Sequence, residues 1–353
     1  MSQNQQGLEE ANLRIVLDLM GGDHAPLAPA DGAAEALAAE PRLEMVLVGG
    51  PGALRAAESR LGAYRARVEY VESTQSIDND ENPSMAVRRK KDSSLVVGMR
   101  LAAERRSALV SCGPTGALMA AGLFAFGRIP GVRRPALGSP FPNLAQPGRA
   151  WFMLDIGANV EATAKDLYTY AVIGSLYSEM VLGVKAPRVG LLNVGTEPQK
   201  GNEVTRQAYQ LLAQADLNFA GNVEAREIFG GSVDVVVCDG FVGNVLLKGL
   251  EGLAGSIGDV VRAELGTDSR SRAGAFLARP YLRRALGRLD YSEYGGAPLL
   301  GLAGACIKCH GSSGARAVSK GIALASQFVS QEVLEAITKS LAAQPPDSDE
   351  QTK

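Results

Sequence analysis

Five consecutive residues near the C-terminus have the spacing of a haem-attachment motif. They are Cys306-Ile-Lys-Cys309-His310, which reads C-x-x-C-H, the pattern that binds a c-type haem covalently. The run from 305 to 310 has the apolar character of a strand, however, and residues three apart in a strand point to opposite faces. Cys306 and Cys309 therefore cannot both reach one porphyrin edge. The residue of this motif that could take part in a reaction is His310, which ends a predicted strand just before Gly311-Ser312-Ser313.

A second stretch, Ser111-Cys-Gly-Pro-Thr-Gly-Ala-Leu118, predicts an anion-binding turn. It follows an apolar strand and opens an apolar helix, so the free N–H groups of the first helical turn would face an anion. Gly113 and Gly116 allow close approach of the backbone, and Thr115 adds a hydroxyl. The alternative interpretation is an ordinary turn that only joins the strand to the helix.

A third stretch carries four consecutive cations, Arg88-Arg-Lys-Lys91, followed by Asp92-Ser-Ser94, which is typical of a helix cap. The functional interpretation is that Lys90 or Lys91 reaches a phosphate, or that the run meets an acidic partner. The alternative is a solvated basic face of a helix.

Several classes of function are excluded by what the sequence lacks. It has no G-x-x-x-x-G-K-[ST] loop and no G-x-G-x-x-G followed by an acidic residue at the expected distance. With only two histidines, His24 and His310, the sequence offers few candidates for the histidine of a Ser-His-Asp triad. The histidines and cysteines also lack a recognisable zinc-ligand spacing. We therefore predict neither a metal nor a cofactor. The formal net charge of −2 argues against a nucleic-acid binder, and the four cysteines in apolar settings are typical of reduced thiols in a cytoplasmic protein.

The elements that must position these residues alternate along the chain. Short apolar runs end in glycine and give way to helix-length segments such as 160–182, 202–215 and 242–265. The glycine-ended runs are 15–22, 45–49, 109–113, 152–157, 189–195, 233–240 and 305–311. This alternation predicts an α/β fold with a mostly parallel sheet and helices on both faces. In such a sheet the loops after the strands gather at one edge, where an anionic ligand would bind.

One segment has the composition of a membrane-surface helix. Residues 269–289 contain six arginines and no acidic residue, and from Pro280 the apolar and basic side chains follow helical spacing on different sides. The predicted membrane contacts are Leu282, Arg283, Arg284, Leu286, Arg288 and Leu289. The alternative is a solvated helix that packs on its own protein.

Motifs along the chain, taken together, resemble the phosphate acyltransferases of bacterial phospholipid synthesis (the PlsX family). The matching stretches run in order from about residue 14 to 340: Asp18-Leu-Met-Gly-Gly-Asp23, Lys90-Lys-Asp-Ser-Ser94, Ser111-Cys-Gly-Pro-Thr-Gly-Ala117, Leu154-Asp-Ile-Gly-Ala-Asn159, Asn193-Val-Gly-Thr-Glu-Pro-Gln-Lys-Gly-Asn-Glu203, Gly221-Asn-Val-Glu224, Asp234-Val-Val-Val-Cys-Asp-Gly-Phe-Val-Gly-Asn244, Tyr294-Gly-Gly-Ala-Pro-Leu-Leu-Gly301 and Ile307-Lys-Cys-His-Gly-Ser-Ser313. Two departures stand out. Pro114 occupies a place where the family usually has Asn, and the family does not fix Cys306 and Cys309 as cysteine.

The resemblance implies an enzyme, an acyltransferase that makes acyl phosphate from long-chain acyl-[acyl carrier protein] and inorganic phosphate. It further implies a three-layer α/β/α sandwich like isopropylmalate dehydrogenase and phosphotransacetylase, and a homodimer at the membrane surface. A membrane glycerol-3-phosphate acyltransferase would receive the product for phosphatidic acid synthesis. We expect one domain over 14–342 between polar tails at 1–13 and 343–353, the latter disordered, in a cytoplasmic, peripherally membrane-associated protein.

The chemistry of that reaction fits the residues found. Phosphate is already a nucleophile near neutral pH, so the protein has to position the reactants and stabilise an oxyanion. We predict that Gly113, Thr115 and Gly116 hold phosphate or the oxyanion together with Gly311, Ser312 and Ser313. Lys91 or Lys200 would assist, and His310 would donate a hydrogen bond or protonate the departing sulfur. The alternatives are a phosphotransacetylase-like enzyme that uses acyl-CoA, a non-catalytic membrane-docked scaffold for acyl carrier protein, and, less favoured, a dehydrogenase.

Overall fold

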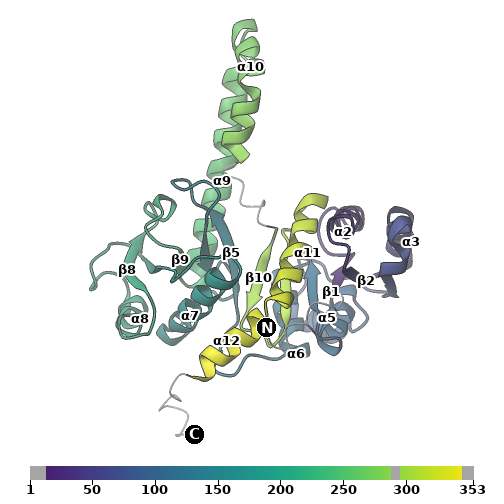
Figure 1. Cartoon of the computed structure of the whole chain (residues 1–353), viewed down its shortest axis with the longest axis horizontal. Coiled ribbons are helices and arrows are strands. Elements are labelled where there is room, and N and C mark those ends of the chain that lie inside the picture. The colour runs from purple at the N-terminus through teal and green to yellow at the C-terminus, as the bar shows by residue number, and fades with distance from the viewer. Residues whose placement is uncertain (1–12, 288–294, 344–353) are drawn as a thin grey trace, which may run out of the picture. The chain divides into compact units, whose positions relative to one another are not determined.

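The computed structural model describes residues 13–287 and 295–343, and the chain divides into two compact units (Figure 1). Unit 1 comprises residues 1–135 and 294–353, so the chain leaves it and later returns to it; unit 2 comprises residues 136–293. The two tails predicted at 1–13 and 343–353 lie outside the described residues except for Leu13 and Ala343.

Unit 1 is built on a mostly parallel sheet in the order β3-β2-β1-β4-β11-β10. Its strands are β1 (Leu13–Asp18), β2 (Leu43–Gly49), β3 (Val68–Glu72), β4 (Ala108–Ser111), β10 (Ala297–Leu300) and β11 (Ala305–Lys308). Only β10 is antiparallel to its neighbour β11, and the other described pairings are parallel. The inner strands β1 and β4 are buried on both faces, which explains their continuous apolar sequences.

Helices cover both faces of this sheet. One group consists of α2 (Leu27–Ala39), α3 (Pro51–Leu61) and α11 (Ala315–Ser330), with α12 (Val333–Ala342) packed on α11. The other group consists of α4 (Pro83–Arg89), α5 (Ser94–Glu104) and α6 (Thr115–Ala125). The helices α2 and α11 approach closely, since a Cβ on Gly32 would lie 2.7 Å from the carbonyl oxygen of Ala315. Unit 1 therefore has the predicted three-layer α/β/α arrangement.

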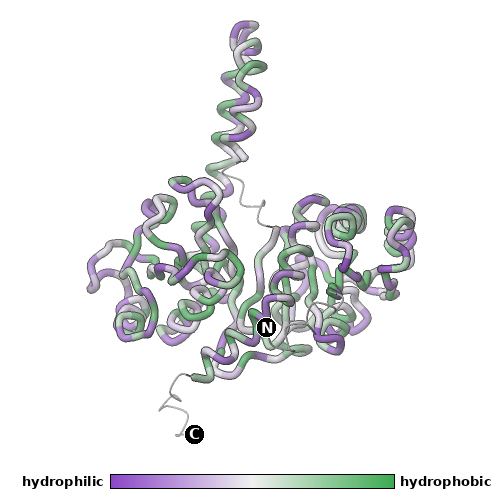
Figure 2. The backbone as a smooth tube through the Cα atoms, in the orientation of Figure 1, coloured by the Kyte–Doolittle hydropathy of each residue, from purple (hydrophilic) through white to green (hydrophobic). Residues whose placement is uncertain are grey.

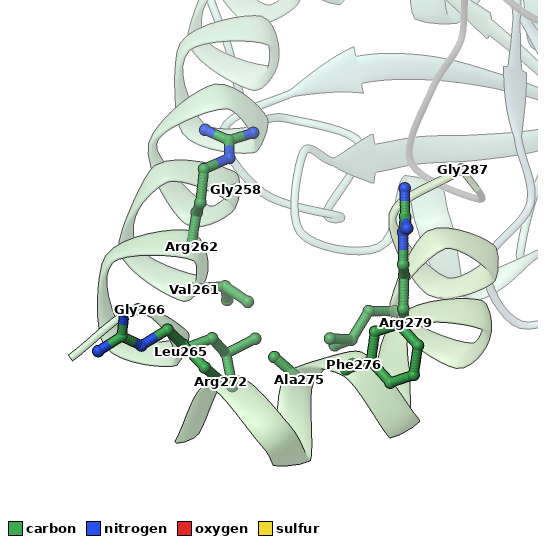
Figure 3. Close-up of a pocket in the computed structure, with 11 residues that line it drawn as sticks. Gly258, Val261, Arg262, Leu265, Gly266, Arg272, Ala275, Phe276, Arg279 and Gly287 are labelled. Atoms are coloured by element: carbon green, nitrogen blue, oxygen red, sulfur yellow. The ribbon is translucent and has the colours of Figure 1, made fainter. Parts of the chain in front are cut away.

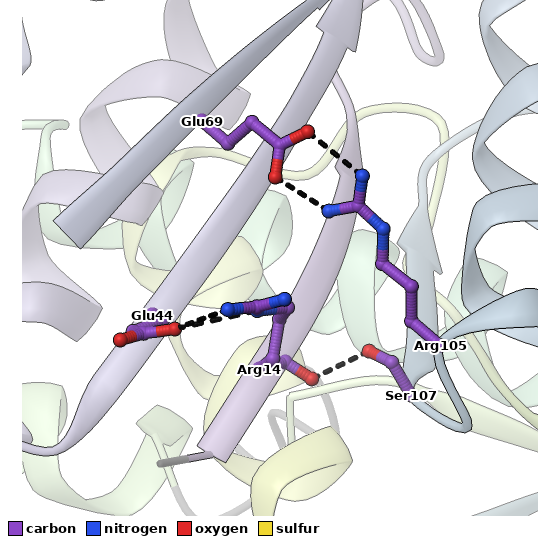
Figure 4. Close-up of polar contacts among 5 residues, drawn as sticks. All are labelled: Arg14, Glu44, Glu69, Arg105 and Ser107. Atoms are coloured by element: carbon purple, nitrogen blue, oxygen red, sulfur yellow. Dashed lines mark hydrogen bonds and ion pairs between the residues drawn. The ribbon is translucent and has the colours of Figure 1, made fainter.

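The amino ends of the strands in unit 1 are tied together by polar side chains (Figure 4). Arg14 on β1 pairs with Glu44 on β2 at 2.8 Å. Arg105 pairs through two nitrogens with Glu69 on β3, and its hydrogen bonds hold the pKa of that carboxyl below its usual value. The Ser107 hydroxyl donates to the carbonyl oxygen of Arg14. Such exposed pairs contribute little stability each, but they link the strands at their amino ends, opposite to the loops at their carboxyl ends.

The strands of unit 2 are mostly parallel and lie in the order β5-β6-β9-β7-β8. Its strands are β5 (Ala136–Pro142), β6 (Ala150–Leu154), β7 (Val189–Asn193), β8 (Phe219–Glu224) and β9 (Val235–Val237). The strand β5 is antiparallel to β6, and the other pairings are parallel. The helix α7 (Ala164–Met180) packs on β6 and β9 and on α8 (Glu203–Ala213). The core includes Phe152 stacked on Tyr177, with 4.2 Å between ring centroids.

Unit 2 also carries a hairpin of two long helices, α9 (Gly240–Leu265) and α10 (Ser269–Gly287) (Figure 1). In α9 only Gly240, Gly243 and Leu247 are buried, all near its first turns. The sequence showed helical spacing from Pro280 onward within the arginine-rich segment 269–289; the helix α10 begins earlier, at Ser269, and contains Pro280 inside it. The earlier start has a local cause, because the Asp268 carboxylate accepts hydrogen bonds from the N–H groups that open the helix, at 2.7 and 2.8 Å.

Candidate active site

Three loops of unit 1 meet at the carboxyl ends of β1, β4 and β11. These strands are parallel neighbours, so the turns that follow them lie at the same edge of the sheet. The N–H of Asp23, after β1, donates to the carbonyl oxygen of Gly311, after β11, at 2.8 Å. The N–H of Cys309 donates to the carbonyl oxygen of Ser111 at 2.9 Å. The turns at 113–116 and 310–313 therefore follow neighbouring strands at one edge of the sheet.

A buried carboxylate links two of these loops. Asp18, at the end of β1, is only 1 % exposed. Its Oδ1 accepts the N–H of Met20 at 3.0 Å, and its Oδ2 accepts the Ser111 hydroxyl at 2.7 Å. The Ser111 oxygen in turn accepts the N–H of Gly113 at 2.9 Å. Asp18 and Ser111 lie within the motifs on which the resemblance rests, but no role was predicted for either. Each is a polar residue that ends a buried strand just before a glycine turn, and this pattern could have marked both as site residues.

Two glycines let the loop after β1 approach the other two turns. A Cβ on Gly21 would lie 2.5 Å from the backbone nitrogen of Gly113. Gly22 has φ of +92°, and a Cβ there would lie 2.7 Å from Cys112 Cβ and 2.8 Å from the Gly311 carbonyl oxygen. Real Cβ atoms do not tolerate such distances to a backbone, so the loop requires glycine at both positions.

His310 is exposed and is oriented by the turn that follows it. Its Nδ1 accepts the N–H of Ser312 at 3.2 Å and lies 2.8 Å from the Ser312 hydroxyl oxygen. Because Nδ1 accepts a backbone N–H, the proton of the neutral ring is left on Nε2. The Nε2–H group is then the donor that His310 offers to a ligand. The N–H of Ser313 donates to the His310 carbonyl oxygen at 3.0 Å and closes the turn.

The helix starts at this edge keep their N–H groups available. Asn82 and Ser93 cap α4 and α5 through their side chains, whereas α6, after Pro114, and α11, after Gly314, have no side-chain cap. The first N–H groups of a helix have no partner within the helix, and the N-cap residues Pro114 and Gly314 supply none through a side chain. Both starts therefore present N–H groups and the positive end of a helix dipole to an anion.

The predicted lysines occupy different settings. Lys90 is engaged, since its ammonium contacts the Glu81 carboxylate at 2.6 Å and the Ser76 carbonyl oxygen at 2.8 Å. Lys91 is exposed, and the segment after it reaches the site, where Leu95 would lie 3.2 Å from a Cβ on Gly113. Lys200 belongs to unit 2, where it is exposed in the loop after β7. Because the Lys90 ammonium is paired with Glu81, Lys91 is the better candidate of the two to reach a phosphate.

Two buried thiols lie directly beneath the turns. Cys112 follows β4 and Cys309 follows β11, at neighbouring positions of the parallel register. A hydrogen bond between them, together with burial, raises the pKa of the Cys112 thiol well above its ordinary value. Burial raises the pKa of Cys306 to about 12. Thiols of this kind stay protonated and fill space, so they serve as core residues and not as nucleophiles.

Unit 2 has its own polar turn at the end of β6. The buried carboxylate of Asp155 accepts the N–H groups of Gly157, Ala158 and Asn159 at 2.9 to 3.0 Å. It also accepts the N–H of Leu137 at 3.1 Å. These hydrogen bonds use both carboxylate oxygens, so Asp155 shapes the turn and has little capacity left for a ligand.

The sequence was then compared with known proteins. A family model described as fatty acid synthesis protein matches residues 13–336. The chain is 49 % identical over 330 residues to the phosphate acyltransferase of Brevibacillus brevis, covering 93 % of this chain and 97 % of that protein. It is 48 % identical over 332 residues to the phosphate acyltransferase of Heliobacterium modesticaldum, covering 93 % and 98 %. The chain belongs to the fatty acid synthesis protein family. The predicted resemblance is therefore confirmed.

Solved structures confirm the predicted fold class for this member of the fatty acid synthesis protein family. A phosphotransacetylase from Streptococcus pyogenes matches with a TM-score of 0.60 and 18 % identity, covering 95 % of this chain and 100 % of that chain. A branched-chain phosphotransacylase from Enterococcus faecalis V583 matches with a TM-score of 0.56 and 13 % identity, covering 90 % and 99 %. At such low identity the likeness concerns the fold alone.

Proposed function

We propose that this chain transfers a long-chain acyl group from acyl carrier protein to inorganic phosphate. The products are acyl phosphate and free carrier protein, and a membrane glycerol-3-phosphate acyltransferase uses the acyl phosphate for phospholipid synthesis. Membership of the family supports the proposal, as do relatives named phosphate acyltransferase. The observation that carries it is the meeting of His310 with two uncapped helix starts at one edge of the sheet in unit 1.

The reaction is an attack of a phosphate oxygen on the thioester carbonyl carbon. A C–O bond forms, the carbonyl oxygen becomes an oxyanion in the tetrahedral intermediate, and the C–S bond then breaks. The sulfur leaves with the bonding electron pair as a thiolate, which then takes a proton from water. The protein has to hold the phosphate, stabilise the oxyanion and assist the sulfur, and this needs N–H donors and cations rather than a triad.

The residues of unit 1 supply those functions in the proposed mechanism. The N–H groups of Thr115, Gly116 and Gly311 and the Ser313 hydroxyl bind the phosphate or the oxyanion, because they belong to turns at one edge of the sheet. The N–H groups of Ser312 and Ser313 are used within their own turn, where they hold His310. Lys91 of unit 1 adds positive charge. The Nε2–H of His310 donates to the departing sulfur. Pro114 has no side-chain amide, so the turn acts through its backbone.

A donor assay tests the proposed function. The purified protein, given palmitoyl-[acyl carrier protein] and inorganic phosphate, is expected to release carrier thiol and form acyl phosphate, trapped as a hydroxamate. Omitting phosphate is expected to abolish thiol release. Faster turnover of palmitoyl-CoA than of the carrier thioester would instead support a phosphotransacetylase-like enzyme. Carrier protein binding without any phosphate-dependent turnover would support a scaffold.

We further propose that the hairpin of α9 and α10 contacts the membrane surface and that the chain is a homodimer. A groove of about 810 Å³ lies between the two helices, lined by apolar residues such as Val261 and Phe276 and by arginines such as Arg272 (Figure 3). Along the hairpin, hydrophobic and hydrophilic residues lie interspersed (Figure 2). Phe276 and Leu277 are 74 % and 75 % exposed. Both side chains can therefore insert at the boundary between the lipid headgroups and the acyl chains of a membrane.

The residues predicted to contact the membrane from the sequence are only partly described. Leu282 lines the groove, and the Arg284 guanidinium lies 5.8 Å from the centroid of the Tyr281 ring. The backbones of Arg283 and Leu286 belong to α10, but their side chains are outside the described residues, as are Arg288 and Leu289 altogether. Within the described ranges, no helix has the length and apolar character needed to cross a bilayer.

Vesicle flotation tests the membrane contact. Replacing Phe276 and Leu277 together with serine is expected to lower binding to phosphatidylglycerol vesicles by about tenfold or more, since each buried apolar side chain contributes roughly 1.5–3 kcal/mol. Binding of the unchanged chain should weaken on neutral vesicles because the arginines lose their anionic partners. Full flotation of the double variant would contradict the proposed membrane contact.

Light scattering of both proteins measures the mass in solution and so checks the proposed dimer. A monomeric mass for the unchanged chain would overturn the proposed homodimer.

A further inference from the structure

The helix α4 of unit 1 presents a basic and apolar face to solvent. Its buried residues are Ala86 and Val87, which face the protein. Met85, Arg88 and Arg89 are exposed and follow the spacing i, i+3, i+4, so they lie on one side of the helix. Met85 is 47 % exposed, which is unusual for a large apolar side chain on a helix that packs against its own protein.

The neighbouring helix α6 extends this face. Its last turn carries Leu123, 38 % exposed, and Phe124, 60 % exposed. The guanidinium of Arg88 lies 5.4 Å from the centroid of the Phe124 ring, a cation–π contact that joins the two helices at the surface. We call the surface made by Met85, Arg88, Arg89, Leu123 and Phe124 the α4–α6 face.

The positive charge of this face has no local counter-charge. The sequence has no Asp or Glu from residue 82 to 91 or from residue 105 to 154, which together include both helices. The nearest preceding acid, Glu81, is paired with Lys90. Among the described residues no carboxylate pairs with Arg88 or Arg89. Unpaired arginines beside exposed apolar side chains have the composition of a protein interface rather than of an ordinary solvated surface.

The α4–α6 face leads directly to the candidate active site. At its other end α4 contacts the start of α6, because a Cβ on Gly116 would lie 2.7 Å from Pro83 Cγ. Helix α6 runs from Thr115 in the site to Ala125 beside Phe124. At 1.5 Å per residue, Phe124 lies roughly 14 Å from the site along this helix. A protein docked on the face would thus hold a substrate on a flexible arm within reach of the site.

We propose that the α4–α6 face docks the acyl carrier protein, a small acidic helical protein that carries its thioester on a flexible prosthetic arm. This inference rests on the proposed function. The arginines attract the acidic carrier and orient it, the apolar side chains bury the centre of the contact, and the arm follows α6 into the site. The membrane is assigned to the hairpin of unit 2, which offers the more extensive apolar surface.

Charge reversal at Arg89 tests this surface, with Arg55→Glu as the matched control. Arg55 is exposed on α3, which lies in the other group of helices of unit 1, and the two variants have the same net charge. With palmitoyl-[acyl carrier protein] and phosphate, Arg89→Glu is expected to raise KM for the carrier thioester at least about tenfold and to leave kcat nearly unchanged. Arg55→Glu should match the unchanged chain. Binding of fluorescently labelled carrier protein, measured by anisotropy, should weaken in parallel and should weaken with added salt.

Four outcomes decide the inference. Equal KM and equal carrier binding for Arg89→Glu and the unchanged chain overturn it. An equal loss with a palmitoyl-pantetheine thioester, which lacks the protein, also overturns it, because the variant then damages the site itself. A loss of vesicle binding without a change in KM would assign the face to lipid, and a change in mass by light scattering would assign it to a contact between copies. If the unchanged chain makes no acyl phosphate, the proposed function fails, and anisotropy alone still decides whether the face binds the carrier protein.

Discussion

Replacing Gly22 with alanine is expected to lower kcat for acyl phosphate formation by about 100-fold or more. The new Cβ would lie 2.7 Å from Cys112 Cβ and 2.8 Å from the carbonyl oxygen of Gly311, so it would push apart the two turns that form the site. The backbone is also left-handed there, with φ of +92°, which costs an alanine about 1 kcal/mol or more. A displacement of about 1 Å at reacting groups is enough for a loss of this size.

The matched control for this substitution is Gly52→Ala. Gly52 is exposed in the first turn of α3, and nothing lies within 4 Å of the position where its Cβ would be. It should keep full activity. Thermal unfolding of both variants separates a local displacement from global loss of structure. A Gly22→Ala protein that unfolds cooperatively and retains full kcat would show that the two turns do not act together.

Removal of the His310 side chain is the second large effect that we expect. His310→Ala should lower kcat by about 100-fold or more and leave KM for phosphate nearly unchanged, because a hydrogen bond to the departing sulfur strengthens mainly in the transition state. Ser312→Ala should have a smaller effect. It removes the hydroxyl 2.8 Å from Nδ1, but the Ser312 N–H that directs the ring remains. The measurement is the steady-state rate of acyl phosphate formation at saturating carrier thioester.

His24→Ala is the control for this experiment. His24 is the other histidine of the chain, and it lies exposed in the loop after β1. It should keep its activity, since no hydrogen bond or ion pair among the described residues connects its ring to the site. If His310→Ala formed acyl phosphate at the unchanged rate, His310 would have no part in the mechanism, and the N–H groups of the turns would have to act alone on the sulfur.

The sequence by itself predicted the elements that have a local cause. The apolar runs that end in glycine became β1, β2, β4, β6, β7, β9 and β11, because a strand buried on both faces needs continuous apolar residues. The helix cap predicted at Asp92-Ser-Ser94 is present, with Ser93 accepting the N–H of Val96. The turn at 113–116 and His310 could be selected because glycines, a hydroxyl and a histidine follow buried strands.

Two antiparallel strands were not found from the sequence. The antiparallel strands β5 and β10 were not predicted, since β5 contains Pro140 and Pro142 and β10 is short. Both break the simple alternation of strand and helix on which the prediction relied. The helical spacing visible from Pro280 covers only the last part of α10, because the cap provided by Asp268 begins the helix at Ser269.

The sequence determined which residues stand at strand ends, and with them the class of chemistry, because glycine turns, burial and helix starts are local properties. Only the tertiary structure decided which of those ends meet. The parallel register places β1, β4 and β11 side by side, so that Asp18 reaches Ser111 across 93 positions of sequence and holds Gly113. It also placed Lys90 against Glu81 and left Lys91 exposed. Which strand ends meet and which lysine is paired both depend on distances between segments that are far apart in the chain. No short stretch of sequence contains that information.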